Sequence, residues 1–272
     1  MPKQDSDHVP DEGLRRELKA TAIAAARTAG GIIRDCARAG FRVELKDTVN
    51  LVTDADRRSE QAIIEAILAK FHDHRILAEE GGQHAAGASP FQWIIDPLDG
   101  TTNFAHGFPA YCVSIGIEYE GQGLLGVVYD PTRDELFTGE RGSGAFLNDR
   151  PIHASKTVTL NQALLVTGFA YDIRVSPNNN LNYFNRFAVR AQGLRRTGTA
   201  ALDLCYVACG RFDGFWELKL KPWDTAAGSV ILTEADGRIT DFKGGAFSIY
   251  GQEMAASNGL IHEAMLDVLG RP

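Results

Sequence analysis

The run Trp93-Ile94-Ile95-Asp96-Pro97-Leu98-Asp99-Gly100-Thr101-Thr102-Asn103-Phe104 is the most informative stretch of the sequence. Its first three residues are apolar and predict a buried strand that stops at Asp96-Pro97. The carboxylates of Asp96 and Asp99 therefore follow the carboxyl end of a strand, where open α/β sheets usually bind ligands. Gly100 and the threonines after it could then open a helix whose free N–H groups hold an anion such as phosphate.

Two carboxylates beside an anion-binding turn make chemical sense if a divalent cation lies between them. Mg²⁺ takes oxygen ligands, usually one or two carboxylates together with substrate phosphate and water. The alternative is structural, because Asp-Pro and Asp-Gly are ordinary turn dipeptides and the acids could cap the next helix. The complete run favours the metal and phosphate interpretation.

Length and composition exclude several other classes of protein. The chain has 272 residues, a formal net charge of −7 and 44% hydrophobic residues. Such a length predicts one large domain or two closely packed halves with a core that needs no disulfide or metal. The acidic balance argues against direct nucleic-acid binding or adsorption to an anionic membrane. Without a secretory signal or an apolar run of roughly 20 residues, we expect a cytoplasmic protein.

The remaining pattern predicts a layered α/β protein. Helical spacing predicts a long helix from Asp11 to Ala39, weakened at Gly30-Gly31, and a second helix from Thr53 to Phe71. Short β-rich runs between Tyr111 and Phe146 predict an antiparallel meander. Beyond a Gly- and Asn-rich boundary, strands and helices alternate: we expect strands at 163–167 and 214–217, and helices at 180–190, 200–209 and 225–234.

Further motifs then occur in the order that they have in a known family. Trp223-Asp224-Thr225-Ala226-Ala227-Gly228 resembles the Trp-Asp-x-Ala-Ala-Gly motif of the inositol monophosphatases, and residues 93–104 resemble the signature of the same family. Other matches are Lys46 with Val52-Thr53-x-x-Asp56, the acidic pair Glu79-Glu80, and Gly198-Thr199-Ala200-Ala201. The resemblance runs from about Leu14 to Leu269 and is strongest to the bacterial inositol-monophosphatase-like extragenic suppressor proteins.

The resemblance implies an αβαβα sandwich in two halves. The N-terminal half, residues 1–148, would carry most metal ligands. The C-terminal half, residues 149–272, would carry Asp224 and the residues that determine substrate specificity.

The resemblance also implies a site with two Mg²⁺ ions. Glu79, Asp96 and the backbone carbonyl of Leu98 would hold the first ion. Asp96 would bridge to a second ion that Asp99 and Asp224 complete, giving a two-metal clamp. A third, weaker ion near Glu79 is left open.

The resemblance assigns catalytic and substrate-binding roles as well. Asp56 would hydrogen-bond Thr101, and with Glu79 this pair would orient a metal-bound water for in-line attack on phosphorus. Backbone N–H groups of Gly100 and Thr101 would hold the phosphate oxygens. Ala200 would contact the substrate ring, and Glu217 would accept hydrogen bonds from its hydroxyls.

Each of these acids has an ordinary structural alternative when taken alone. Asp56 could be a first-turn acid favoured by the helix dipole, and Asp224 could be a helix N-cap. Glu79 could be a solvated loop acid. Two departures from the family pattern also stand out: Ala78 replaces a usual Gly, and Asn50 replaces a frequent Asp, which weakens the case for a third ion.

The expected activity is Mg²⁺-dependent hydrolysis of inositol 1-phosphate or a similar small polyol phosphate. A histidinol-phosphate phosphatase of the same family is the main alternative, because such enzymes share the catalytic motifs. A regulatory role in transcription or ribosome biogenesis, through contact with RNA polymerase, is the second alternative. Inhibition by lithium and a homodimer are expected from the resemblance alone.

Overall fold

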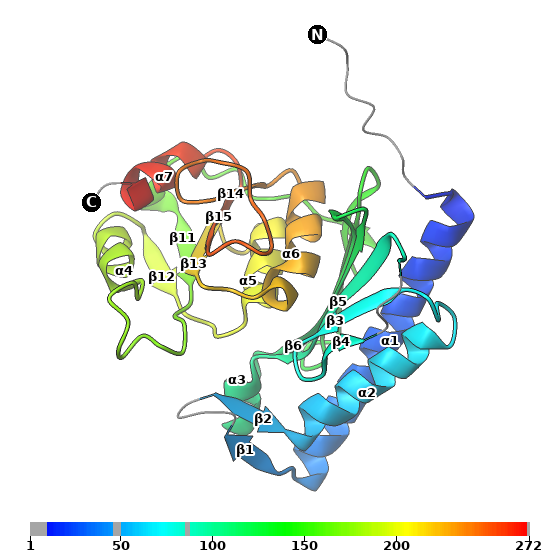
Figure 1. Cartoon of the computed structure of the whole chain (residues 1–272). Helices are drawn as coiled ribbons and strands as arrows, with labels where there is room; N and C mark the ends of the chain where they lie inside the picture. The colour runs from blue at the N-terminus through cyan, green and yellow to red at the C-terminus, as the bar shows by residue number, and fades with distance from the viewer. Residues whose placement is uncertain (1–9, 46–49, 85–87, 271–272) are drawn as a thin grey trace.

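The chain forms five layers of alternating helices and sheets. The structure is a computed structural model that describes residues 10–45, 50–84 and 88–270, so Lys46 lies outside the described residues. Helices α1 and α2 cover one face of an eight-stranded sheet, and α5 and α6 cover the other face (Figure 1). A five-stranded sheet follows, with α4 and α7 beyond it. The αβαβα sandwich is confirmed.

The bounds of the elements are as follows. Among the described residues, the helices are α1 (Glu12–Ala39), α2 (Asp54–Leu68), α3 (Thr101–Ala105), α4 (Leu181–Ala188), α5 (Ala200–Ala208), α6 (Pro222–Glu234) and α7 (His262–Gly270), with a 3₁₀ turn η1 at Leu160–Gln162. The large sheet has the order β10-β9-β8-β7-β6-β5-β3-β4 and the small sheet β12-β11-β13-β15-β14. The strands are β1 (Val43–Leu45), β2 (Leu51–Thr53), β3 (Arg75–Ala78), β4 (Gly82–His84), β5 (Phe91–Asp99), β6 (Cys112–Tyr119), β7 (Gln122–Asp130), β8 (Glu135–Glu140), β9 (Gly144–Leu147), β10 (Arg150–Pro151), β11 (Leu164–Thr167), β12 (Gly193–Arg195), β13 (Gly214–Leu218), β14 (Arg238–Thr240) and β15 (Glu253–Ser257).

Helix α1 is more regular than its sequence predicts. The expected weakening at Gly30-Gly31 is wrong, because the helix continues unbroken to Ala39. Gly30 serves packing instead: a Cβ atom at this position would lie 2.5 Å from the ring of Tyr129. The missing side chain lets α1 approach strand β7 closely, and that contact offsets the low helix propensity of glycine.

Strand β5 also differs from the prediction. It does not stop at Asp96-Pro97 but continues to Asp99, with an irregular register between Asp96 and Asp99 in its pairing with β6. Pro97 lacks a backbone N–H, which a bulge tolerates and a regular central ladder does not. The bulge bends the end of the strand and so sets the direction of its two acids.

Helix α6 begins three residues earlier than expected. Pro222 occupies its first turn, a position where the fixed φ of proline suits a helix start. Asp224 is therefore not an N-cap. It lies inside the first turn, where its Oδ2 accepts the backbone N–H of Lys221 at 2.6 Å.

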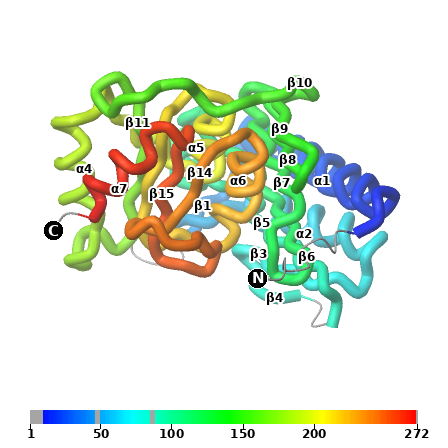
Figure 2. Tube along the Cα trace, turned by 90° about the horizontal axis from the view of Figure 1, so that it is seen from above, coloured from blue at the N-terminus to red at the C-terminus, as the bar shows by residue number. Residues whose placement is uncertain are grey.

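The antiparallel meander is confirmed as β6 to β9, and α5 and α6 fill the space between the two sheets. Figure 2 shows both helices between β7 of the large sheet and β15 of the small one. One hydrophobic cluster joins the two sheets through these helices, with Val128 and Phe137 on the large sheet and Val166 and Phe215 on the small sheet. The division into halves at residue 148 stays a prediction. None of the described helices combines the length and apolar character that crossing a bilayer requires.

Candidate metal and phosphate site

The expected site residues meet at one edge of the large sheet, facing the starts of several helices. Strands β3 and β5 are parallel neighbours, so Glu79 follows one strand beside the end of the other, and its N–H donates to Ile95 O at 3.1 Å. Asp224 comes to this edge from the first turn of α6, and Ala200 begins α5. Helix N-termini carry partial positive charge, which favours acids and anions there.

Asp56 is fixed by its own helix start and reaches across to Thr101. As part of a capping box, its Oδ2 accepts the backbone N–H of Thr53 at 2.8 Å and the hydroxyl of Thr53 at 2.5 Å. Its Oδ1 accepts the hydroxyl of Thr101 at 2.9 Å. The same hydroxyl lies 3.0 Å from Leu98 O. The predicted Asp56–Thr101 contact is therefore present, and burial raises the pKa of Asp56 to about 6.

Three aspartates are each held by hydrogen bonds to one of their two oxygens. Asp96 Oδ1 accepts Leu98 N–H at 3.0 Å. Asp99 Oδ2 accepts the hydroxyl of Thr199 at 2.6 Å and the N–H of Ala201 at 2.8 Å. Asp224 uses its Oδ2 for the Lys221 contact. These hydrogen bonds fix the direction of each carboxylate and place the second oxygen for another partner.

The electrostatics of this group are unfavourable without added positive charge. Burial raises the pKa of Asp96, and the charges of Glu79, Asp99 and Asp224 raise it further. Burial likewise raises the pKa of Asp99 and of Asp224, and the charges of Asp99, Glu79 and Glu217 raise the pKa of Asp224 further. The hydroxyl of Thr199 counteracts the rise at Asp99. Carboxylates that resist ionisation through mutual repulsion favour the binding of a cation.

The donor set suits a hard divalent cation, because it consists of carboxylate oxygens and the Leu98 carbonyl. In the described part of the chain, no three His, Cys, Asp or Glu side chains already stand in an arrangement that could hold a metal ion. The repulsion among the acids acts in the direction that keeps them apart. The residues therefore fit Mg²⁺ by chemistry, and binding would require their carboxylates to approach one another.

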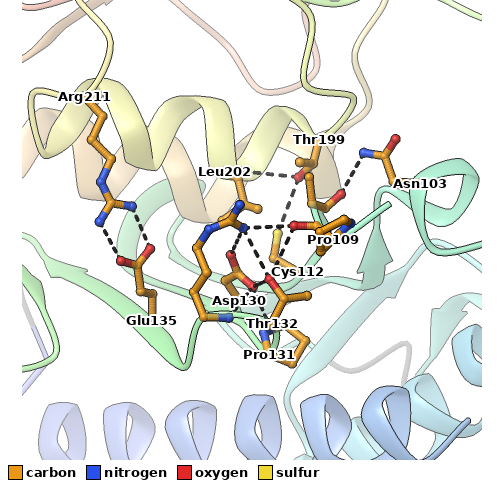
Figure 3. A network of polar contacts seen from close by, with 12 residues as sticks. Asn103, Pro109, Cys112, Asp130, Pro131, Thr132, Glu135, Thr199, Leu202 and Arg211 are labelled. Carbon is orange, nitrogen blue, oxygen red and sulfur yellow. Dashed lines mark hydrogen bonds and ion pairs between the residues drawn. The ribbon is translucent and has the colours of Figure 1, made fainter. Parts of the chain in front are cut away.

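The turn after β5 is held in place by residues distant in sequence. Gly100 has φ +95°, and a Cβ there would lie 2.9 Å from Ala110 O. The backbone of Gly100 helps to lower the pKa of the Asp99 carboxyl. Asn103, labelled in Figure 3, donates to Ala110 O at 2.7 Å. It also donates to Thr197 O at 2.8 Å, so α3 is tied to the segment before α5.

The two expected substrate residues line the other side of the site. Ala200 and Glu217 are each 8% exposed, at the start of α5 and on β13. A Cβ on Gly168 would lie 2.3 Å from both carboxylate oxygens of Glu217, so the acid fills the space beside this glycine. Burial raises the pKa of Glu217 to about 8, and the charge of Asp203 adds to the shift.

Two supporting residues were not assigned a role by the sequence analysis. Thr199 holds Asp99 and also accepts the N–H of Leu202 as the N-cap of α5, with Cys112 Sγ 3.6 Å away (Figure 3). Glu60, on α2, accepts the N–H of Glu80 at 2.9 Å and so supports the turn that carries Glu79. The Gly-Thr-Ala-Ala motif contains Thr199 and was a signal for its role, whereas nothing in the local sequence marks Glu60.

Comparisons with known proteins identify the family of the chain. Residues 14–270 match the model of the inositol monophosphatase family. An inositol-1-monophosphatase of Synechocystis sp. is 48% identical over 220 residues, which is 81% of this chain and 77% of that protein. A Nus factor SuhB of Pasteurella multocida is 44% identical over 248 residues, 90% of this chain and 92% of that protein. The crystal structure of the extragenic suppressor protein suhB from Bartonella henselae has a TM-score of 0.89 at 37% identity and covers 94% of this chain and 99% of its own.

The five-layer fold and the acidic edge of its large sheet thus define the class of protein, a layered α/β phosphatase. The chain belongs to the inositol monophosphatase family, as the order of its motifs indicates. Its relatives include proteins with enzymatic names and proteins with regulatory names.

Proposed function

We propose that the protein is a Mg²⁺-dependent phosphomonoesterase that hydrolyses inositol 1-phosphate, or a similar small polyol phosphate, by direct attack of water on phosphorus. The observation that supports the proposal is the buried Asp56–Thr101 hydrogen bond of 2.9 Å, because Thr101 follows closely on Asp96 and Asp99, two acids whose charges repel each other. The Synechocystis relative, named for this substrate, supports the choice of inositol 1-phosphate.

Glu79, Asp96 and Leu98 O would hold one Mg²⁺, and Asp96, Asp99 and Asp224 a second. When bound, Mg²⁺ supplies the positive charge that stabilises phosphate oxygens and the leaving alkoxide, and it makes water a better nucleophile at neutral pH. Because hydrogen bonds engage Oδ1 of Asp96 and Oδ2 of both Asp99 and Asp224, the other oxygen of each would bind the ion.

The protein's own part in the proton transfer falls to Thr101 and Asp56. Thr101 donates to Asp56 Oδ1, so its oxygen can accept a hydrogen bond from the attacking water. The proton released on attack would pass through Thr101 Oγ1 to Asp56, which Thr53 holds from the opposite side. Glu79 helps to orient the water, and backbone N–H groups at Gly100 and Thr101 would hold the phosphate.

The alcohol part of the substrate would lie between Ala200 and Glu217. Both are nearly buried at the boundary between the acidic edge and the small sheet. A protonated Glu217 can donate a hydrogen bond to a substrate hydroxyl as well as accept one, so it suits a polyol.

Steady-state kinetics on a panel of phosphate esters, with Mg²⁺ and with EDTA, tests the proposal. We expect activity on inositol 1-phosphate that requires Mg²⁺. A kcat/KM for histidinol phosphate more than about tenfold higher, or about 1.4 kcal/mol, would overturn the assignment of inositol 1-phosphate as substrate and favour the main alternative. Full activity of an Asp99→Asn variant at saturating Mg²⁺ would overturn the assignment of the second ion.

A regulatory function is the second candidate, because one relative is named a Nus factor. We propose that such a role would use a protein partner, RNA polymerase being the candidate, since the net charge of −7 opposes direct RNA binding. Pull-down with Asp99→Asn separates the two roles. Partner capture without phosphatase activity would show that they are independent.

Three finer features are proposed from the family alone. These are a homodimer, inhibition by lithium, and a third, weaker ion near Glu79, where Asn50 supplies an amide rather than a carboxylate. Sedimentation analysis, lithium titration of the activity, and calorimetric counting of bound Mg²⁺ test them in turn.

A further inference from the structure

The loop from Gly168 to Asn180, between β11 and α4, is fastened at both ends to strand β13. Asn180, 3% exposed, donates to Gly168 O at 2.6 Å and so closes the loop. Its Oδ1 accepts the indole N–H of Trp216 at 2.7 Å. The first residue of the loop lies against the carboxylate of Glu217. The loop therefore takes its position from the strand that carries the expected substrate acid.

Lys219, just beyond β13, makes a third attachment at the middle of the loop. Its Nζ donates to Asp172 Oδ2 at 2.6 Å and to Ser176 Oγ at 2.8 Å. Its backbone has φ +63°, in the left-handed region, which is strained for a residue with a side chain. A glycine would adopt this conformation freely but could not reach the loop.

Tyr171 precedes Asp172 in this loop, so the Lys219 attachment acts on its immediate neighbour. Its side chain interacts with the hydroxyl of Thr102, in the first turn of α3, while the residue remains 54% exposed. Partial burial raises the pKa of Tyr171 to about 12, and the charges of Glu79 and Asp99 contribute to the rise. The contact with Thr102 thus joins the loop to the start of α3, directly after the expected phosphate-binding residues Gly100 and Thr101, while about half of the Tyr171 surface stays exposed.

We propose that Tyr171 determines specificity by contacting the alcohol part of the phosphate ester, and that Lys219 is a positioning residue that holds it there. The inference rests on the proposed phosphatase function and names the substrate class more closely: a phosphorylated ring that bears hydroxyl groups. The phenol ring packs on the C–H face of such a ring, and its hydroxyl donates to a substrate oxygen.

Matched substrates test the role of Tyr171. Inositol 1-phosphate is compared with cyclohexyl phosphate, which has the ring without the hydroxyls, and with ethyl phosphate, which has neither. Tyr171→Phe should lower kcat/KM for inositol 1-phosphate about fivefold, as expected for one neutral hydrogen bond, and leave cyclohexyl phosphate unchanged. Tyr171→Ala should lower kcat/KM for both ring substrates and leave kcat/KM for ethyl phosphate unchanged.

Two variants with opposite charge changes test the role of Lys219. Lys219→Gly and Asp172→Asn both break the attachment, but one removes a positive and the other a negative charge. If position matters, both should lower kcat/KM for inositol 1-phosphate by about fivefold through KM, and the double variant should fall no further. Asp236→Gly is the control, because Asp236 also has a positive φ, +65°, and an exposed ion pair with His153, at the far end of α6. It should change neither KM nor kcat.

The outcomes separate this inference from the function on which it rests. If Lys219→Gly and Asp172→Asn shift the ratio of inositol to ethyl phosphate activity in opposite directions, charge rather than position is responsible and the role of Lys219 is overturned. If the wild type hydrolyses all three esters and the Tyr171 variants keep its ratio, the specificity role fails while the phosphatase stands. If the wild type hydrolyses none of a broad ester panel, the proposed function itself fails.

Discussion

Two buried aspartates on the same sheet show how differently one side chain can be used. Asp130, at the end of β7, is 0% exposed, and Asp96, on β5, is 2% exposed. Asp130 accepts the N–H and the hydroxyl of Thr132, each at 2.7 Å, and the guanidinium of Arg133 at 2.9 Å (Figure 3). Asp96 instead faces the negative charges of Glu79, Asp99 and Asp224, which raise its pKa.

The difference separates architecture from function. Asp130 has its hydrogen-bonding and charge requirements met inside the fold, and its contacts hold the turn after β7 against Pro109 O. The surroundings of Asp96 oppose its negative charge, so an ionised Asp96 lowers the stability of the folded protein. An acid retained against its own surroundings is explained by a partner that arrives later, here a cation.

The sharpest way to break this comparison is to neutralise each acid in turn. Asp96→Asn should lower kcat about a thousandfold or more, because it removes charge stabilisation of the transition state, while the metal-free protein keeps or gains stability. Asp130→Asn should keep the activity of the folded protein but lose about 2 kcal/mol of stability, since Arg133 loses its charged partner. Kinetics and urea unfolding measure the two effects. A loss of activity in both variants with no loss of stability would contradict the division.

Metal binding gives the second test. Mg²⁺ at about 100 times its Kd should stabilise the folded state by about 2.7 kcal/mol. The melting temperature should then rise by about 5 °C for a chain of this size, and EDTA should reverse the rise. Asp130→Asn should retain the increase and Asp96→Asn should lose most of it. An equal rise in both variants would place the ion elsewhere.

Glu217 extends the comparison to an acid that burial keeps protonated. Its pKa rises from 4.5 to about 8, so the folded protein holds a proton that the unfolded chain releases in this range. The associated stability is fully present below pH 4.5 and is lost as the pH rises through 8. Between pH 5 and 8 the metal-free wild type should lose on the order of 2 kcal/mol more than Glu217→Gln, which keeps the shape of the protonated acid. Urea unfolding of the two proteins at pH 5, 6, 7 and 8 measures this difference. If the free energy of unfolding changes equally with pH in both proteins, Glu217 is already ionised and the prediction is wrong.

The motifs predicted much of the fold and the family because they are local. Asp96, Asp99 and Asp224 lie in short runs whose residue types and order carry the chemistry, and the meander follows from alternating β-rich segments and turns. The structure brings these runs to one edge of the sheet, and the contact of Asp56 with Thr101 is present as expected.

What the sequence analysis missed depends on contacts between distant segments. Glu60 supports Glu80 from a helix 20 residues away, and Lys219 binds a loop 43 to 47 residues before it. The course of β5 through Pro97 depends on pairing with β6, which tolerates the bulge. Propensity and spacing hold no information on these pairings, because tertiary packing decides them.

Gly30 and Gly31 offer the smallest test, on the structural side of the same comparison. Gly30 faces Tyr129, the neighbour of Asp130, and this ring cannot move freely because its hydroxyl donates to Asp134 at 2.7 Å and accepts from Arg34 at 2.9 Å. Gly30→Ala should therefore destabilise the protein by about 1 kcal/mol, because the clash exceeds the gain in helix propensity. A Cβ on Gly31 would meet nothing within 4 Å, so Gly31→Ala should stabilise by roughly 0.5–1 kcal/mol. Neither change should affect kcat, and urea unfolding measures both. Equal stabilisation by the two substitutions would mean that the Tyr129 ring gives way, and that Gly30 does not set the distance between α1 and the sheet.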